Sequence, residues 1–151
     1  MSLVKRFNIF PRTLYRVQPK IAVNLRNYET QMALGRTSYD LKTVNGLVMP
    51  AVGEEFIGPN GMSLRPATDK MIGILKEFKG EPRVYAMLEG SPVPAGLVVL
   101  HEHSDHYSLQ TSEPITLDAL NAKMTEFLKT IPSQTREQFF AQMADEDDQD
   151  N

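Results

Sequence analysis

An arginine stands in the middle of a short apolar stretch near the beginning of this chain. Arg16 lies within residues 13–17, whose other members are Thr, Leu, Tyr and Val, so the stretch favours a β-strand with one charged side chain. Burying a guanidinium costs more free energy than its apolar neighbours gain, unless an anion or a carboxylate meets it. The sequence therefore leaves two structures open: an edge strand whose arginine points to water, or a strand on which Arg16 faces an anionic partner.

Composition limits the class of protein. The chain has 151 residues, of which 41% are hydrophobic and 23% charged, as in an ordinary globular domain. It contains no cysteine, which excludes disulfides, a thiol nucleophile and cysteine-bound zinc. No apolar run reaches the roughly 18 residues of a membrane span, and residues 1–20 lack the apolar stretch of a secretory signal. We expect one domain over residues 1–144 and no membrane partner.

The two ends of the chain carry opposite charge. Residues 1–28 contain six basic side chains and no acid, whereas residues 145–151 contain five acids, no base and no apolar side chain. We expect the latter to form a disordered acidic tail. Residues 1–144 then hold 16 basic and 14 acidic groups, too small an excess for a general nucleic-acid binder. The basic start resembles a mitochondrial presequence, but Pro11 and Pro19 would break its helix, so a cytoplasmic location is preferred.

Short strands and capped helices predict an α+β fold. Strand patterns occupy residues 13–17, 61–65, 83–88, 96–101 and 106–110. Helices are expected over 68–79 and 116–131 and from 133 onward, with Thr68, Thr116 and Ser133 as N-caps, and the segment 23–34 is also expected to be helical. The tight connection between Leu100 and Tyr107 favours antiparallel pairing.

Known motifs exclude several activities, and one histidine cluster remains. The chain lacks the two glycine-rich motifs that bind phosphates, the Gly-x-x-x-x-Gly-Lys-Ser/Thr loop and the Gly-x-Gly-x-x-Gly turn. It also lacks the Gly-x-Ser-x-Gly elbow of hydrolases. His101, His103 and His106 lie within six residues, and two of them would share a strand face, which suits zinc, iron or manganese. Residues 102–105 have the composition of a turn that would separate His103 from its neighbours. We therefore favour a non-metal catalytic role for His106 and a turn position for His103 over a metal site.

The order of several segments resembles a known family. The segments are Leu14-Tyr15-Arg16, Gly61-Met-Ser63-Leu-Arg65-Pro before a helix, Arg83-Val-Tyr85, Pro94-Ala-Gly96-Leu97 and His106-Tyr107-Ser-Leu109. Together they are similar to the ADP-ribosyltransferase-type toxins that bacteria deliver by type VI secretion and that fungi also encode. The resemblance covers residues 11–130.

The resemblance implies a fold and an activity. The fold would be compact, with two small, mainly antiparallel sheets around a cleft that holds NAD, together with helices. The activity would be that of an NAD-dependent mono-ADP-ribosyltransferase, which cleaves the nicotinamide–ribose bond and transfers ADP-ribose to an intracellular target or to water. A protein or nucleic-acid target, an immunity protein and action in the cytosol of a target or host cell are further expectations.

The resemblance also assigns roles to residues of this chain. Arg16 takes the place of the family's first-strand arginine and would clamp the dinucleotide. Ser63 would shape the nicotinamide pocket, with Arg65 facing the same side two residues later. His106 would polarise the ribose and Tyr107 would pack the nicotinamide ring, although neighbours on a strand face opposite ways, so only one should line the cleft. The expected catalytic residues are thus Arg16, Ser63 and His106, and the expected NAD contacts are Arg16, Ser63, Arg65 and Tyr107.

One element of the wider transferase pattern is missing from the sequence. Most such enzymes place a glutamate late in the fold, and the nearby candidate here, Glu113, precedes Pro114 in an expected loop. We therefore do not assign Glu113 as the catalytic glutamate. Two alternatives to the transferase therefore stay open: a non-catalytic toxin or binding module that occludes a partner protein, and a metal enzyme built on the histidine cluster.

Overall fold

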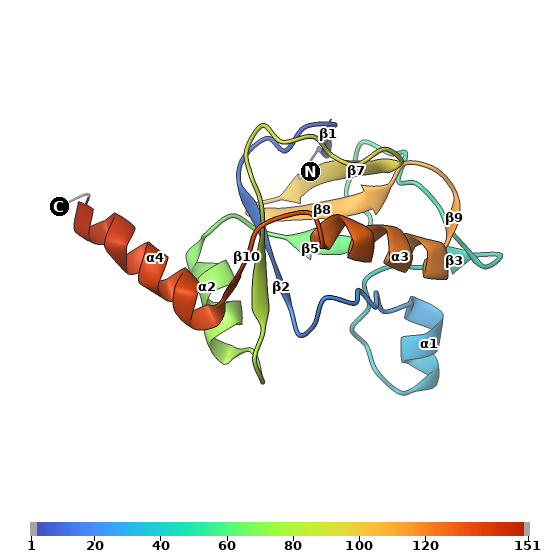
Figure 1. The fold of residues 1–151 in the computed structure, drawn as a ribbon. Coiled ribbons are helices and arrows are strands. Elements are labelled where there is room, and N and C mark those ends of the chain that lie inside the picture. Colours follow the sequence, from blue (N-terminus) through green and yellow to red (C-terminus); the bar gives the residue numbers. More distant parts are fainter. Residues whose placement is uncertain (1–2, 150–151) are drawn as a thin grey trace.

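The computed structural model describes residues 3–149 and has an α+β architecture (Figure 1). These residues form three small antiparallel sheets and four helices. The first sheet has the order β1-β7-β8-β5, with β1 at Lys5–Phe7, β7 at Leu97–His103, β8 at His106–Thr111 and β5 at Met62–Leu64. The second has the order β10-β6-β2, with β10 at Ser133–Thr135, β6 at Arg83–Met87 and β2 at Leu14–Gln18. The expected α+β class is confirmed.

A third sheet adds to the two that we expected. It has the order β3-β4-β9, with β3 at Thr43–Val44, β4 at Leu47–Val48 and β9 at Ile115–Thr116. Each of its strands has two residues, which is too few for an alternation of apolar and polar residues to mark them in the sequence. The four helices are α1 at Tyr28–Ala33, α2 at Asp69–Glu77, α3 at Leu117–Leu128 and α4 at Arg136–Gln149.

The first two sheets are joined through a pair of backbone hydrogen bonds. Tyr15 N–H donates to the carbonyl of Arg65 at 2.7 Å, and Arg65 N–H donates back to the carbonyl of Tyr15 at 3.1 Å. This bridge holds β2 beside β5, so Arg16 and Ser63 come from different sheets but lie next to each other. The candidate site described below is built at this junction.

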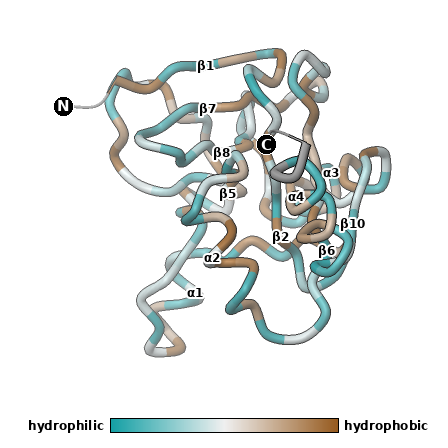
Figure 2. The backbone as a smooth tube through the Cα atoms, turned by 90° about the vertical axis from the view of Figure 1, so that its left-hand side faces the viewer, coloured by the Kyte–Doolittle hydropathy of each residue, from teal (hydrophilic) through white to brown (hydrophobic). Residues whose placement is uncertain are grey.

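The core is enclosed by helices. Leu120, Met124 and Leu128 recur at helical spacing on α3 and are at most 1% exposed, because this face packs on the main apolar cluster. Below the four-stranded sheet lie α1 and α2 (Figure 2), and α2 buries Met71 and Leu75 in a second cluster with Phe139 of α4. None of the helices within residues 3–149 is long and apolar enough to cross a membrane.

The helix caps agree with the sequence at two of three positions. Thr68 Oγ1 accepts a hydrogen bond from Met71 N–H and Thr116 Oγ1 from Ala119 N–H, which confirms both N-caps. The expected cap at Ser133 is wrong, because residues 133–135 pair with β6 as β10. Thr135 caps α4 instead: it accepts from Gln138 N–H at 3.1 Å, and Gln138 Oε1 accepts from Thr135 N–H at 2.9 Å.

The segment 23–34 is helical over only part of its length. Helix α1 covers Tyr28–Ala33, whereas the residues before it are extended. The N–H groups of Val23 and Leu25 donate to side chains of α3, at 2.9 Å to Thr125 and 3.0 Å to Asn121. These long-range hydrogen bonds satisfy the backbone without a helix, which explains why the local pattern misled.

The acidic end of the chain also differs from the expectation of a disordered tail at 145–151. Helix α4 continues to Gln149, so the boundary expected after residue 144 falls inside a helix, while residues 150–151 lie outside the described residues. No glycine or proline follows Pro132 to end the helix. The two hydrogen bonds between Thr135 and Gln138 also stabilise its N-terminus.

Candidate active site

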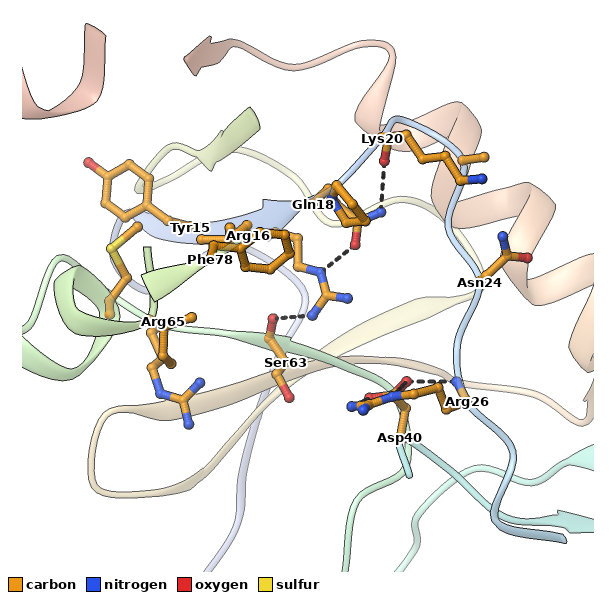
Figure 3. Close-up of a pocket in the computed structure, with 15 residues that line it drawn as sticks. Tyr15, Arg16, Gln18, Lys20, Asn24, Arg26, Asp40, Ser63, Arg65 and Phe78 are labelled. Carbon is orange, nitrogen blue, oxygen red and sulfur yellow. Dashed lines mark hydrogen bonds and ion pairs between the residues drawn. The ribbon is translucent and has the colours of Figure 1, made fainter. Parts of the chain in front are cut away.

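A cavity of about 470 Å³ opens beside the junction of the two sheets, and its size is typical of ligand sites (Figure 3). Its walls come from β2 and the segment after it, from β5, from α2, and from the loops on either side of α1. The lining residues that carry polar or charged groups are Tyr15, Arg16, Gln18, Lys20, Asn24, Arg26, Asp40, Ser63 and Arg65. Three of the residues expected from the sequence, Arg16, Ser63 and Arg65, are thus brought together.

Arg16 lies in this cavity without a carboxylate partner among the described residues. Its Nε donates to Gln18 Oε1 at 2.7 Å and its Nη1 donates to the carbonyl of Ser63 at 3.2 Å, and both acceptors are neutral (Figure 3). Burial lowers the pKa of Arg16 to about 10, with Asp40 opposing the shift and Arg26 adding to it. The guanidinium is therefore charged at neutral pH and incompletely compensated, which excludes the simple strand arginine that points to bulk water.

The cavity carries an excess of positive charge. Arg16, Lys20, Arg26 and Arg65 line it, against the single carboxylate of Asp40. That carboxylate accepts from Arg26 Nη2 at 3.0 Å, from Arg26 Nε at 3.1 Å and from Arg26 N–H at 2.6 Å, so it is fully engaged with one residue. The remaining cations suit a ligand with more than one negative charge.

Arg65 is only loosely paired. Its Nε lies 3.6 Å from Asp105 Oδ1, and this buried nitrogen has no hydrogen-bond partner among the described residues. An unmatched buried donor is costly to leave in a folded protein. The Nε atom itself is enclosed by protein, but the Arg65 side chain lines the cavity and is 18% exposed, so its positive charge acts on a ligand there. The phosphates of a dinucleotide fit this charge.

His106 reaches the cavity through Ser63 and is not itself a lining residue. The register pairs Ser63 with Ser108, so His106, two residues before Ser108 on β8, faces the same side of the sheet. His106 Nε2 and Ser63 Oγ lie 3.1 Å apart. On the other side of the ring, His106 Nδ1 lies 3.0 Å from the carboxylate of Glu102, a side chain that is 2% exposed.

Tyr107 does not contact the cavity, contrary to the expected role in packing nicotinamide. It is buried in the core and its ring stacks on His101 at a centroid distance of 4.3 Å. Because successive strand residues face opposite ways, placing His106 toward Ser63 sends Tyr107 into the core.

The remaining candidates also sit away from the cavity. We expected the turn to separate His103 from its neighbours, but its ring stacks on His106 at a centroid distance of 5.2 Å and meets Phe56 at a tilt of 59° and 5.1 Å. Glu113 only closes a loop, where its N–H and C=O bond to the Thr111 hydroxyl. Within residues 3–149 no group of three or more His, Cys, Asp or Glu side chains is arranged to hold a metal ion.

Sequence reasoning missed several residues of the site, and three of them, Gln18, Asp40 and Glu102, illustrate why. Gln18 could have been found, since it follows Arg16 by two residues on a strand and therefore faces the same side. Asp40 carries no local signal because it reaches the cavity from an irregular loop. Glu102 was read as part of a turn, and only the pairing of β7 with β8 shows that it lies under His106.

Comparison with known proteins adds one match. The family model described as Tse2 ADP-ribosyltransferase toxin matches residues 12–139. No curated protein and no solved structure matches the chain. The matched range includes the whole cavity and both residues behind Ser63.

Proposed function

Since this chain belongs to the Tse2 ADP-ribosyltransferase toxin family, we propose that it binds NAD in the cavity beside Arg16 and breaks the nicotinamide–ribose bond. The ADP-ribosyl group then passes to a target molecule or to water. The resemblance to the transferase-type toxins of type VI secretion is confirmed by the family match. The use of NAD and the placing of its site are our proposal.

The observation that carries this proposal is the charge of Arg16. The Arg16 side chain is half-buried, and its guanidinium is ionised and bonded only to neutral oxygens. A folded protein retains such a group at a cost in stability, and an anionic ligand offsets the cost when it binds. The pyrophosphate of NAD supplies two negative charges, and a guanidinium fork can contact neighbouring phosphate oxygens at once.

The other lining residues have roles that follow from their chemistry. Arg65, which lines the cavity and is only loosely paired with Asp105, offers its positive charge to the same phosphates. Ser63, between the two arginines, contacts the ribose next to nicotinamide. Loss of nicotinamide leaves a positively charged, oxocarbenium-like ribose, and the protein accelerates this step by holding the reacting atoms in place and by stabilising the charge that develops.

A second candidate function is a binding module that holds NAD or a protein partner without turnover. One observation favours it: the carboxylate that lines the cavity, Asp40, is held by Arg26 in three hydrogen bonds and is not available for catalysis.

The partners of the protein follow from its proposed role as a toxin. The chain would act in the cytosol of a target cell, on a protein or nucleic acid, and would be countered there by an immunity protein.

Nicotinamide release from NAD distinguishes these functions. We expect the wild-type protein to release nicotinamide and Arg16→Met to lose at least about 100-fold in rate, as for other charge-stabilising groups. Arg83→Met is the matched control, because Arg83 lies on the same sheet and bonds Ser133 outside the cavity. Binding of NAD without release would favour the binding module, and absence of both would contradict the proposal.

A further inference from the structure

Three side chains from three adjacent strands form a line that ends at the cavity. Ser63 of β5 lies 3.1 Å from His106 Nε2, and His106 Nδ1 lies 3.0 Å from Glu102 Oε1 on β7. The strands stand side by side in the order β7-β8-β5. Only the Ser63 end reaches the cavity, since Glu102 is 2% exposed and the His106 side chain 14%.

The register of the hairpin places Glu102 on the same face as His106. His101 pairs with Tyr107, so Glu102, the next residue on β7, points to the opposite face, which is also the face of His106, the neighbour of Tyr107 on β8. A β-bulge follows, because His103 and not Glu102 pairs with His106. The extra residue brings His103 to this face too, where its ring stacks on that of His106.

The charges around His106 fix the role of each ring nitrogen. Glu102 is the acid nearest the ring, whereas the other acid of the turn, Asp105, accepts from Thr68 and faces Arg65. His103, stacked on the ring, is the other titratable neighbour. Glu102 Oε1 and His106 Nδ1 are both buried, and despite their separation of 3.0 Å neither makes a hydrogen bond of good geometry to a described residue. Each is therefore the nearest partner that the other has, and a buried carboxylate beside Nδ1 favours a proton on that nitrogen, which leaves Nε2 as an acceptor for the Ser63 hydroxyl.

The three side chains Ser63, His106 and Glu102 supply the proton acceptor that the cavity otherwise lacks. Transfer of ADP-ribose to a hydroxyl group or to water releases a proton, and a base must take it. Asp40 is held by Arg26 in three hydrogen bonds, and the cations of the cavity cannot accept a proton. Among the described residues, the path from Ser63 to His106 is the one route from a residue that lines the cavity to an imidazole.

We propose that Ser63, His106 and Glu102 form a proton relay that activates a neutral oxygen acceptor, a hydroxyl group or water. The inference rests on the proposed function. The bond between ribose C1′ and the nicotinamide nitrogen breaks, and nicotinamide leaves with the electron pair. The acceptor oxygen bonds to C1′ and gives its proton to Ser63 Oγ, while Ser63 passes its own proton to His106 Nε2. Glu102 is a positioning residue that orients the ring and stabilises the imidazolium until solvent removes the proton.

Nitrogen NMR of the histidine rings tests the relay without NAD. In the wild-type protein near neutral pH, we expect His106 to carry its proton on Nδ1 and to show an unprotonated Nε2 whose shift changes in Ser63→Ala. Glu102→Gln should change the tautomer populations of His106 and leave those of His101 unchanged. A ring protonated at Nε2 and bare at Nδ1 would overturn the proposal, because Nε2 could not then accept from Ser63.

Kinetics test the same relay in turnover. His106→Ala should lower kcat for nicotinamide release by about 10² to 10⁴-fold with little change in KM for NAD. Glu102→Gln should lower kcat in the same way, Glu102→Asp should recover part of the loss, and His101→Gln serves as the control.

Chemical rescue separates a proton acceptor from a space-filling ring. Added imidazole should restore turnover to His106→Ala, whereas 1,2,4-triazole, of the same shape but weakly basic, should not. Equal rescue by both, or unchanged kcat in His106→Ala and Glu102→Gln while the wild type cleaves NAD, would overturn the relay alone. If the wild type releases no nicotinamide, the proposed function is wrong, and the NMR result decides the relay.

Discussion

The Thr68 hydroxyl donates a hydrogen bond to Asp105 Oδ2 at 2.5 Å and so ties the N-terminus of α2 to the turn between β7 and β8. The same hydroxyl oxygen accepts from Met71 N–H as the helix cap, and the same carboxylate faces Arg65. One helix end, one hairpin turn and one arginine of the cavity are thereby held as a unit.

This unit should make stability depend on pH. Burial alone would raise the pKa of Asp105, but the hydrogen bond from Thr68 and the charge of Arg65 together bring it below the ordinary value of 3.8. A depressed pKa stabilises the fold above the unfolded value, and the contribution is lost as pH falls through the folded value. We expect Asp105→Asn to lower the free energy of unfolding by about 1 kcal/mol at neutral pH, with the difference shrinking once the pH falls below 3.8 and passes through the lowered pKa of the folded state. Urea unfolding across this range measures it, and a difference independent of pH would contradict the assignment.

Arg136 should hold α2 and α4 together. Its guanidinium donates to the carbonyls of Phe78 at 3.0 Å and Gly80 at 2.6 Å, in the segment that follows α2. Arg136→Ala leaves these acceptors to water, so we expect a loss of about 1 kcal/mol in the free energy of unfolding and an unchanged KM for NAD. Thermal unfolding and nicotinamide release measure the two effects. A raised KM with normal stability would indicate that Arg136 acts at the cavity.

Truncation after Ala144 should leave the domain intact. Asp145 and Glu146 are exposed, and exposed charges contribute little to stability. Burial, with a smaller effect from Glu146, raises the pKa of Tyr15, which places this acid near a wall of the cavity. We expect an unchanged melting temperature and a modestly lower KM for NAD at low salt, with the difference fading as salt screens the charges. A drop of several degrees would show that the end of α4 stabilises the domain.

Tyr107 should matter for packing and not for NAD. Its ring is buried against His101 in the core, so Tyr107→Phe is expected to keep both kcat and KM. Tyr107→Ala should cost about 3 kcal/mol in the free energy of unfolding, as is usual for loss of a buried aromatic ring. Steady-state kinetics and urea unfolding test this pair. A higher KM for NAD in Tyr107→Phe would contradict this and would indicate that Tyr107 contacts the ligand.

Local sequence signals predicted the elements that hold the cavity. The strands around Arg16 and Ser63 and the caps at Thr68 and Thr116 were found because alternation and capping act over a few residues. The clustering of Arg16, Ser63 and Arg65, with His106 behind, followed from the family resemblance. It did not follow from the residues alone.

Features that depend on long-range contacts escaped prediction. The extended residues around Val23 and Leu25 bond to α3, about 100 positions away, and Asp40 reaches the cavity only after the loops around α1 have folded. The bulge misplaced His103 in the sequence analysis, since alternation counted along the sequence fails where one strand gains a residue, and Glu102 was assigned to the turn because the pairing of His101 with Tyr107 could not be known.

Thermal unfolding with ADP-ribose tests the role of Arg16 most directly. ADP-ribose carries the pyrophosphate of NAD without the bond to be cleaved, so it reports binding alone. Because Arg16 is ionised, half-buried and unpaired with a carboxylate among the described residues, we expect Arg16→Met to melt at or above the wild-type temperature without ligand. We expect ADP-ribose to raise the melting temperature of the wild type and of Arg83→Met but not that of Arg16→Met. An equal shift in all three proteins, or a marked fall in the melting temperature of Arg16→Met without ligand, would contradict the account.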